Sequence, residues 1–281
     1  LRARPVLAGR ARPGSFGPET LPAFYDADPA APLMAVLATL PEAFSKLYPP
    51  DLEGFGLSTR DRITQRSGHP LRVLTDRIAA IFSVEHYELY VHRVRARGVS
   101  IELSEPVSVL VPASITELPE PAQVFLLARA FANIAMRFHV ADKLMPRELE
   151  VLVASAARAF SPGFGAGLTS EDILDDQMKR IQKALSRRAR RALEEATPRY
   201  VQGPPVDFAI WSRGIAVGAA RAAVLVSDDL LATVEVLRRT ERDLAHIDPG
   251  ELVRSSPLVA ELVRWWASEP AIDLRRRAGL L

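Results

Sequence analysis

The chain has 281 residues, of which 48% are hydrophobic, and its formal charge is +2 at neutral pH. These values indicate a globular protein with a sizeable core, in one large domain or two small ones. The absence of cysteine excludes disulfides, thiolate zinc sites and cysteine nucleophiles, and it fits a reducing compartment, so we expect a cytoplasmic protein. No uncharged apolar run reaches about 18 residues, so no transmembrane segment is expected.

The N-terminal region differs in composition from the rest. Residues 1–32 are rich in Pro, Ala, Gly and Arg and lack apolar periodicity, which predicts a linker or a loosely packed lead-in. Leu1 is not a natural start and no signal-peptide pattern follows it, so we expect a piece of a longer protein or a processed one. Residues 33–281 are expected to form a single domain.

The first predicted elements are two helical segments and a small sheet. Residues 32–48 are apolar at helical spacing, with a break at Pro41, and residues 71–82 form a clearer amphipathic helix. Residues within about 86–112 then alternate and are rich in β-formers, which predicts three short strands at 87–96, 99–104 and 107–111. We expect the sheet to be antiparallel in part.

The remainder of the chain is predicted to be helical. Short polar side chains at Thr169, Ser170 and Ser227 mark helix starts, and Ser256-Pro257 places a proline in a first turn. The expected helices are 119–139, 146–160, 169–196, 206–225, 227–245 and 257–268. The fold class is therefore α+β and mostly helical, with an early sheet followed by a helical bundle.

One helix occupies the place where zinc peptidases present their metal ligands. An apolar strand, Val107–Pro112, is followed by a short connector and an apolar helix, Pro119–Ile134. In an H-E-x-x-H helix, two histidines four residues apart bind zinc and the glutamate polarises a bound water. The matching positions here hold Arg129, Ala130 and Asn133, which are a cation, an inert side chain and a poor ligand.

The strand–connector–helix segment Val109–Ala128 resembles the zinc metallopeptidase family that includes the prenyl-protein (CAAX) endopeptidases and the HtpX-like quality-control proteases. In that family a glutamate on a later helix supplies the third ligand, three residues before an Ala-Asp pair. The best local match places Ala216 at the ligand position and Ala220 at the aspartate position. The resemblance implies a zincin-like fold without catalytic groups, metal or cofactor.

A second likeness covers about residues 33–281. It is to a domain at the C-terminal end of large, often tetratricopeptide-containing proteins of myxobacteria, and it implies a peptidase-like fold without peptidase chemistry. The matching pieces are Glu88–Tyr90, Val109–Val111, Phe125–Arg129, Ala220–Leu230, Leu262–Ser268 and Leu274-Arg275.

A basic amphipathic helix is predicted at Met178–Leu193. Its cations suit nucleic acid, acidic lipid or an acidic protein face, although aromatic residues for base stacking are lacking. The cations are Lys179, Arg180, Lys183, Arg187, Arg188, Arg190 and Arg191. Near the C-terminus, Trp265 and Trp266 cannot both face the same side of a helix, so we expect one in the core and the other at a domain or partner surface.

Other polar residues are predicted to have structural roles. None of the five histidines is three or four residues from another, so capping or solvent-facing positions are expected for them. Paired carboxylates, such as Asp228-Asp229, lie at probable helix starts or on polar faces, where the helix dipole or solvent accounts for them. The glycine-rich loop Gly163–Ser170 is interpreted as a helix–helix connection.

These observations predict a non-catalytic protein-interaction or scaffold module within a larger multidomain protein or complex, with a protein or another domain of the same chain as its partner. One alternative is a binder of nucleic acid or acidic surfaces that acts through residues 178–193. A second alternative is an enzyme whose catalytic groups are adjacent only in the folded chain.

Overall fold

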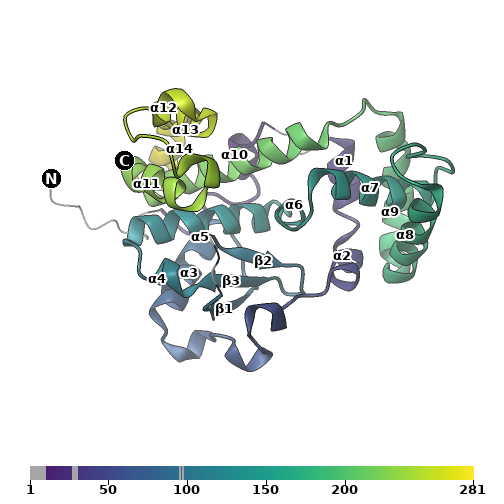
Figure 1. The fold of residues 1–281 in the computed structure, drawn as a ribbon, viewed down its shortest axis with the longest axis horizontal. Helices are drawn as coiled ribbons and strands as arrows, with labels where there is room; N and C mark the ends of the chain where they lie inside the picture. Colours follow the sequence, from purple (N-terminus) through teal and green to yellow (C-terminus); the bar gives the residue numbers. More distant parts are fainter. Residues whose placement is uncertain (1–10, 27–30, 95, 97) are drawn as a thin grey trace.

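The computed structural model describes residues 11–26, 31–94, 96 and 98–281, and it shows a mostly helical chain with one small sheet. This confirms the α+β prediction at the level of fold class. Two hydrophobic clusters divide the molecule into a large lobe, which contains the sheet, and a small, purely helical lobe (Figure 1).

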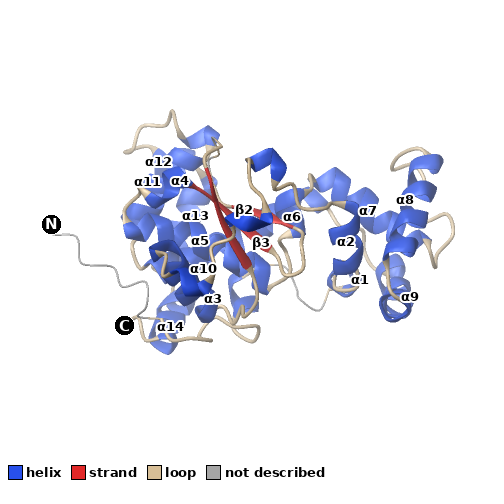
Figure 2. Cartoon of the chain, turned by 90° about the horizontal axis from the view of Figure 1, so that it is seen from below, coloured by secondary structure: helices blue, strands red, loops and turns tan. Residues whose placement is uncertain are grey.

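The sheet belongs to the large lobe and has three strands, as the sequence predicts. They are β1 (Glu88–His92), β2 (Ser100–Glu102) and β3 (Ser108–Pro112), in the order β1-β3-β2. β3 is parallel to β1 and antiparallel to β2, so the expectation of a partly antiparallel sheet is confirmed. The apolar run at 107–111 forms the central strand, and every residue of β3 is buried. Figure 2 shows the strands away from α8 (Glu171–Ala184) and α9 (Arg187–Gln202) of the small lobe.

Helix α5 (Glu120–Ala135) lies at the centre of the large lobe, where it packs against α3 (Pro70–Ile81) and α10 (Phe208–Ser227). α5 is apolar on most of its surface, as expected for a helix with neighbours on several sides. The remaining helices of this lobe are α4 (Ala113–Thr116), α11 (Leu230–Thr240), α12 (Leu252–Ser255), α13 (Pro257–Trp266) and α14 (Glu269–Ala278). Helix α6 (Val140–Lys143) contacts β2, and its Val140 belongs to the hydrophobic cluster of the small lobe.

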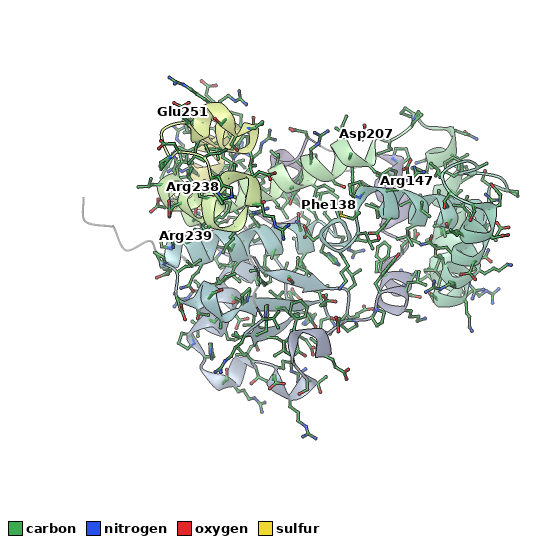
Figure 3. The ribbon with its side chains drawn as sticks, in the orientation of Figure 1. Phe138, Arg147, Asp207, Arg238, Arg239 and Glu251 are labelled. Atoms are coloured by element: carbon green, nitrogen blue, oxygen red, sulfur yellow. The ribbon has the colours of Figure 1, made fainter. Side chains whose placement is uncertain are left out.

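Helix α10 joins the two lobes. Asp207 caps its first turn, Phe208 packs in the small lobe, and the stretch from Ala219 to Val226 is buried in the large lobe. Phe138 lies at the junction, with its ring 5.8 Å from that of Trp211 (Figure 3). Among the helices that the structure describes, α10 alone is long and apolar enough to span a bilayer. Half of that apolar window is buried, and packing against α5 accounts for it.

The small lobe contains α1 (Pro32–Leu37), α2 (Pro41–Leu47), α7 (Pro146–Arg158), α8 (Glu171–Ala184) and α9 (Arg187–Gln202). The prediction of one continuous helix over 169–196 is wrong. The backbone is extended at Leu185, and the Ser186 hydroxyl accepts a hydrogen bond from the Ala189 amide, which starts a new helix. Glu42 of α2 also accepts a hydrogen bond from the Ser186 amide, at 2.7 Å.

The prediction that residues 1–32 form a linker is wrong for residues 11–26. Phe16, Leu21 and Phe24 are fully buried in the large lobe, and Phe16 and Phe24 stack edge to face at 5.1 Å. Sequence periodicity missed this segment because its anchors sit on turns and a single 3-10 turn, Leu21–Phe24. Residues 1–10 and 27–30 lie outside the described residues.

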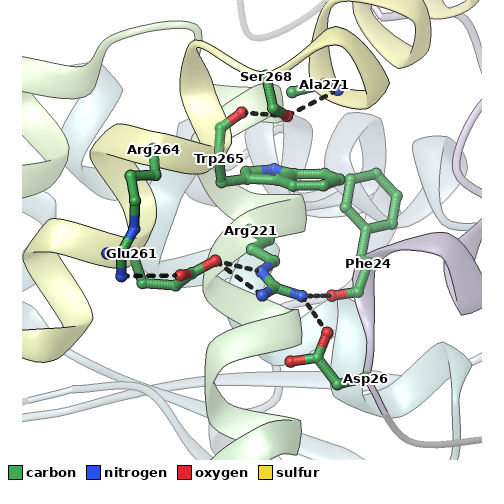
Figure 4. A network of polar contacts seen from close by, with 8 residues as sticks. All are labelled: Phe24, Asp26, Arg221, Glu261, Arg264, Trp265, Ser268 and Ala271. Atoms are coloured by element: carbon green, nitrogen blue, oxygen red, sulfur yellow. Dashed lines mark hydrogen bonds and ion pairs between the residues drawn. The ribbon is translucent and has the colours of Figure 1, made fainter.

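Arg221 of α10 fixes this N-terminal segment to the C-terminal helices (Figure 4). Its guanidinium donates to the Phe24 carbonyl at 3.1 Å and to Asp26 at 2.8 Å. The same group donates to Glu261 of α13 at 2.7 Å and lies 5.4 Å from the ring centroid of Trp265. One partly buried cation therefore links three segments that are far apart in the sequence.

Candidate functional site

A cavity of about 280 Å³ lies between α5 and α10. We call it the α5–α10 cavity. It is surrounded by one face of α5, strand β2 and the two residues before it, α6, α10 and the C-terminal end of α11. The described lining residues are Gly98, Val99, Ile101, Leu126, Arg129, Ala130, Asn133, Asp142, Ala216, Ala219, Thr240 and Glu241.

The spacing of residues along α5 explains why four of its side chains line the cavity. Leu126, Arg129, Ala130 and Asn133 follow the i, i+3, i+4, i+7 pattern of a single helix face. The space remains open because the facing residues of α10, Ala216 and Ala219, have small side chains. Arg129, Ala130, Asn133 and Ala216 are the positions singled out from the sequence, and the structure brings all four to this cavity.

Two polar pairs lie in the cavity. The Arg129 guanidinium and the Glu241 carboxylate are 3.1 Å apart, and both side chains are partly exposed. The Asn133 amide nitrogen donates to the Asp142 carboxylate at 3.0 Å. Of the described lining residues, Arg129 carries a positive charge and Asp142 and Glu241 carry negative charges when ionised, so the lining has a net charge of −1.

Asn133 has an acceptor without a partner. The residue is 5% exposed, and its Oδ1 atom is buried with no hydrogen-bond partner in the part of the chain that the structure describes. The amide cannot turn over without placing Oδ1 against the Asp142 carboxylate, so the hydrogen bond to Asp142 fixes the orientation. Buried acceptors are nearly always satisfied in folded proteins, so this atom marks a place for a donor.

Asp142 is an exposed residue, and the protein around its carboxyl group still changes its pKa. Desolvation by the surrounding protein raises the pKa of its carboxyl group, while the hydrogen bond from Asn133 and the charge of Arg129 act in the opposite direction. A cationic donor next to Asp142 would favour its ionised form.

Tyr25, from the N-terminal segment, lies near Asp142 of the cavity. Burial raises the pKa of its phenol group, and the nearby charge of Asp142 raises this pKa further. The ring stacks on Phe138 at 5.1 Å and lies so close to Gly218 that a Cβ there would overlap it. Because Gly218 has no side chain, the Tyr25 ring can pack directly against α10.

Sequence reasoning missed the two carboxylates of the cavity. Asp142 follows its partner Asn133 by 9 residues, across the end of α5, and Glu241 is 112 residues from Arg129. Neither pair has helical or strand spacing, so the folded chain alone brings the members together.

The described residues contain no group of three or more His, Cys, Asp or Glu side chains that could hold one metal ion. His69 caps α3 by accepting a hydrogen bond from the Leu71 amide, as expected. The expectation of a capping or solvent-facing position is wrong for His92, which is buried. His139 occupies the N-cap position of α6, although its side chain makes no capping hydrogen bond. Desolvation lowers the pKa of both, and that of His139 falls to about 4.

The basic residues predicted on one helix flank the turn between α8 and α9 instead. We call this group the basic tip. All seven side chains are exposed, and Arg191 pairs with Glu195 at 3.2 Å. Within the described part of the chain the other six have no carboxylate within ion-pair distance. The basic tip consists of Lys179, Arg180, Lys183, Arg187, Arg188, Arg190 and Arg191.

Trp265 and Trp266 are both partly buried, so neither matches the expected division into a core and a surface residue. Each is covered by an arginine. Arg221 lies 5.4 Å from the ring centroid of Trp265, and Arg275 lies 4.0 Å from that of Trp266. These contacts give both rings a role inside the large lobe.

Comparison with protein-family models, with curated proteins and with solved structures finds no match. The resemblance to zinc metallopeptidases therefore stays a prediction.

Proposed function

We propose that this chain is a non-catalytic protein-interaction module with a peptidase-like fold. The observation that carries the proposal is the α5–α10 cavity, an open space lined at the four expected catalytic positions by Arg129, Ala130, Asn133 and Ala216. None of these side chains is a nucleophile, a general base or a good metal ligand. A cavity that keeps its space without such groups at those positions is suited to holding a partner.

The neighbouring strand offers a way to hold an extended segment. β2 is an edge strand of the sheet, and Val99 and Ile101, at its beginning, line the cavity. A peptide that pairs with an edge strand gains main-chain hydrogen bonds, and adjacent pockets then select its side chains. We propose that a partner segment adds to β2 and places one group in the cavity.

The non-catalytic part of the proposal is tested by measuring metal content and proteolysis. Purified protein is expected to contain no stoichiometric zinc and to leave a casein substrate intact. Asp142 and Glu241 are the carboxylates of the described lining that an enzyme would use. Hydrolysis that is lost in Asp142→Asn or Glu241→Gln would therefore contradict the proposal.

The binding part is tested by peptide selection. A random-peptide display library is selected on the wild-type protein and then compared on Ala216→Leu, which fills the cavity from α10. Peptides that bind the wild type and lose at least about tenfold in affinity on Ala216→Leu would support the proposal. The matched control is Ala209→Leu, at an exposed position of the same helix. Peptides that bind all three proteins equally, or no peptides at all, would contradict it.

A second candidate function follows from the basic tip, whose cations are exposed and mostly without carboxylate partners. Such a surface binds polyanions through counterion release, and its affinity falls steeply with salt. We propose retention on heparin or DNA that is lost on changing Arg187, Arg188, Arg190 and Arg191 to Glu. Lack of retention by the wild type at low salt would remove this function.

A further inference from the structure

The unpartnered oxygen of Asn133 and the charge of the α5–α10 cavity together indicate what chemical group enters it. We propose that the cavity binds a primary ammonium group, from either a lysine side chain or a free peptide N-terminus. This deepens the proposed function and rests on it, since it names the group that a partner segment would place in the cavity.

The first argument is hydrogen bonding. Asn133 Oδ1 is a buried acceptor in need of a donor, and the Asp142 carboxylate beside it already accepts from the Asn133 nitrogen at 3.0 Å. A carboxylate has room for further donors. An ammonium group carries three donors and no acceptor, so it matches an Asn133 Oδ1 that lacks a donor and a carboxylate that accepts further donors. An anionic or purely acceptor group would leave Oδ1 without a partner.

The second argument is charge. The Arg129 guanidinium is paired with Glu241 at 3.1 Å, so its charge is largely neutralised within the cavity. Asp142 is then the excess charge of the described lining, and its hydrogen-bond donor among the described residues is the neutral amide of Asn133. One ligand cation brings the described lining to neutrality, and a charge-assisted hydrogen bond is stronger than a neutral one.

The third argument is size. A cavity of about 280 Å³ between alanines admits a slender chain and excludes a bulky one. A lysine stem or the first residue of a peptide fits this space, and the apolar lining by Leu126, Ala130 and Ala219 suits methylene groups.

The test uses small probes and ligand-observed NMR on the whole chain. Nα-acetyl-lysine-N-methylamide presents a side-chain ammonium, and alanine-N-methylamide presents an α-ammonium. Each is compared with its acetylated counterpart, which has no charge. We expect at least one ammonium probe to bind at least about tenfold more tightly than its acetylated form, which corresponds to about 1.4 kcal/mol. The probe that binds identifies the source.

Two variants connect binding to the cavity. Asp142→Asn removes the charge, and Ala216→Leu removes the space while keeping every polar group. Both should weaken binding at least about tenfold, whereas the exposed control Glu117→Gln should not. If Asp142→Asn fails to fold, Ala216→Leu still decides the result. Equal binding of charged and acetylated probes, or no binding of either ammonium probe, would overturn the ammonium assignment. Peptides selected in the cavity would still leave the proposed interaction function standing.

Discussion

The α5–α10 cavity and the basic tip differ in whether their charged side chains have polar partners. In the cavity, Arg129 faces Glu241 and Asp142 faces Asn133, so each charged group has a polar partner within about 3 Å. At the basic tip, most of the cations have no carboxylate partner among the described residues and project into solvent. The difference follows from solvation, because water stabilises an exposed charge and protein must replace that stabilisation when the charge is enclosed.

This comparison indicates where each region can respond to a partner. A ligand in the cavity must match a fixed arrangement of donors and acceptors, so recognition there is specific and only weakly dependent on salt. A polyanion at the basic tip interacts with exposed cations, so recognition there is general and strongly dependent on salt. The predictions below separate the two regions, in order of decreasing effect.

The largest expected effect is on the helix that forms one wall of the cavity. Phe131 on α5 is fully buried and stacks edge to face on Tyr87 at 4.9 Å. Phe131→Ala should lower the free energy of unfolding by about 3–5 kcal/mol, since it removes packing and leaves a void. Urea titration measures the change. The control Lys183→Ala, on the basic tip, should change it by less than about 0.5 kcal/mol. Similar losses in both variants would contradict the comparison.

The second effect is a pH dependence that His139 contributes from beside α5. Desolvation lowers its pKa from the ordinary 6.5 to about 4. The unfolded chain therefore binds a proton between these values that the folded chain does not, so stability is lost as pH falls from about 6.5 to 4. At about 1.4 kcal/mol per pKa unit, the full loss is about 3 kcal/mol.

Urea titrations at several pH values between 4 and 7.5 measure this contribution as the difference between the wild type and His139→Gln. The difference should shrink as pH falls through this window. His86→Gln is the matched control, since its side chain is 86% exposed and solvent surrounds it in both states. A difference between the wild type and His139→Gln that stays constant with pH would show that His139 does not contribute in this way.

The sequence predicts the parts of this structure that have a local period. Alternation located the sheet, and the apolar face of α5 placed Arg129, Ala130 and Asn133 on one side of a helix. Ala216 is identified through the resemblance to zinc metallopeptidases rather than through helical periodicity, and it lines the same cavity. Long helices with strong apolar faces are the elements for which local pattern and tertiary packing agree.

What the sequence does not predict depends on contacts between distant segments. Phe16 and Phe24 lie in a stretch with linker composition, yet they are buried because α10 and α13 provide the other side of the core. The turn at Leu185-Ser186 is surrounded by good helix formers, so local sequence does not predict it. The Glu42 carboxylate, which accepts a hydrogen bond from the Ser186 amide, is 144 residues away in the sequence. Such tertiary partners override local propensity.

The third effect is at this turn. The Ser186 hydroxyl accepts from the Ala189 amide and donates to Glu42, at 3.3 Å and 3.0 Å. Ser186→Ala should lower the free energy of unfolding by about 1 kcal/mol, since it removes the N-cap of α9. Ser186→Thr keeps the hydroxyl and should retain most of the stability. Thermal and urea unfolding of both variants measure the effect, and equal loss in the two would show that the cap is not the cause.

The smallest effect has the opposite sign and concerns the basic tip itself. Arg187 and Arg188 lie in the first turn of α9, where the helix dipole disfavours positive charge, and α9 has no acidic residue in that turn. Arg187→Gln with Arg188→Gln should therefore raise the free energy of unfolding by about 0.3–0.5 kcal/mol at low ionic strength. The gain should disappear near 1 M salt, where charges separated by more than about 3 Å are screened.

The double variant should also elute earlier from heparin. Greater stability together with weaker retention would mean that these arginines serve a partner at the expense of the fold. Unchanged retention would mean that Arg187 and Arg188 do not bind polyanions, and it would favour the cavity as the functional region of the chain.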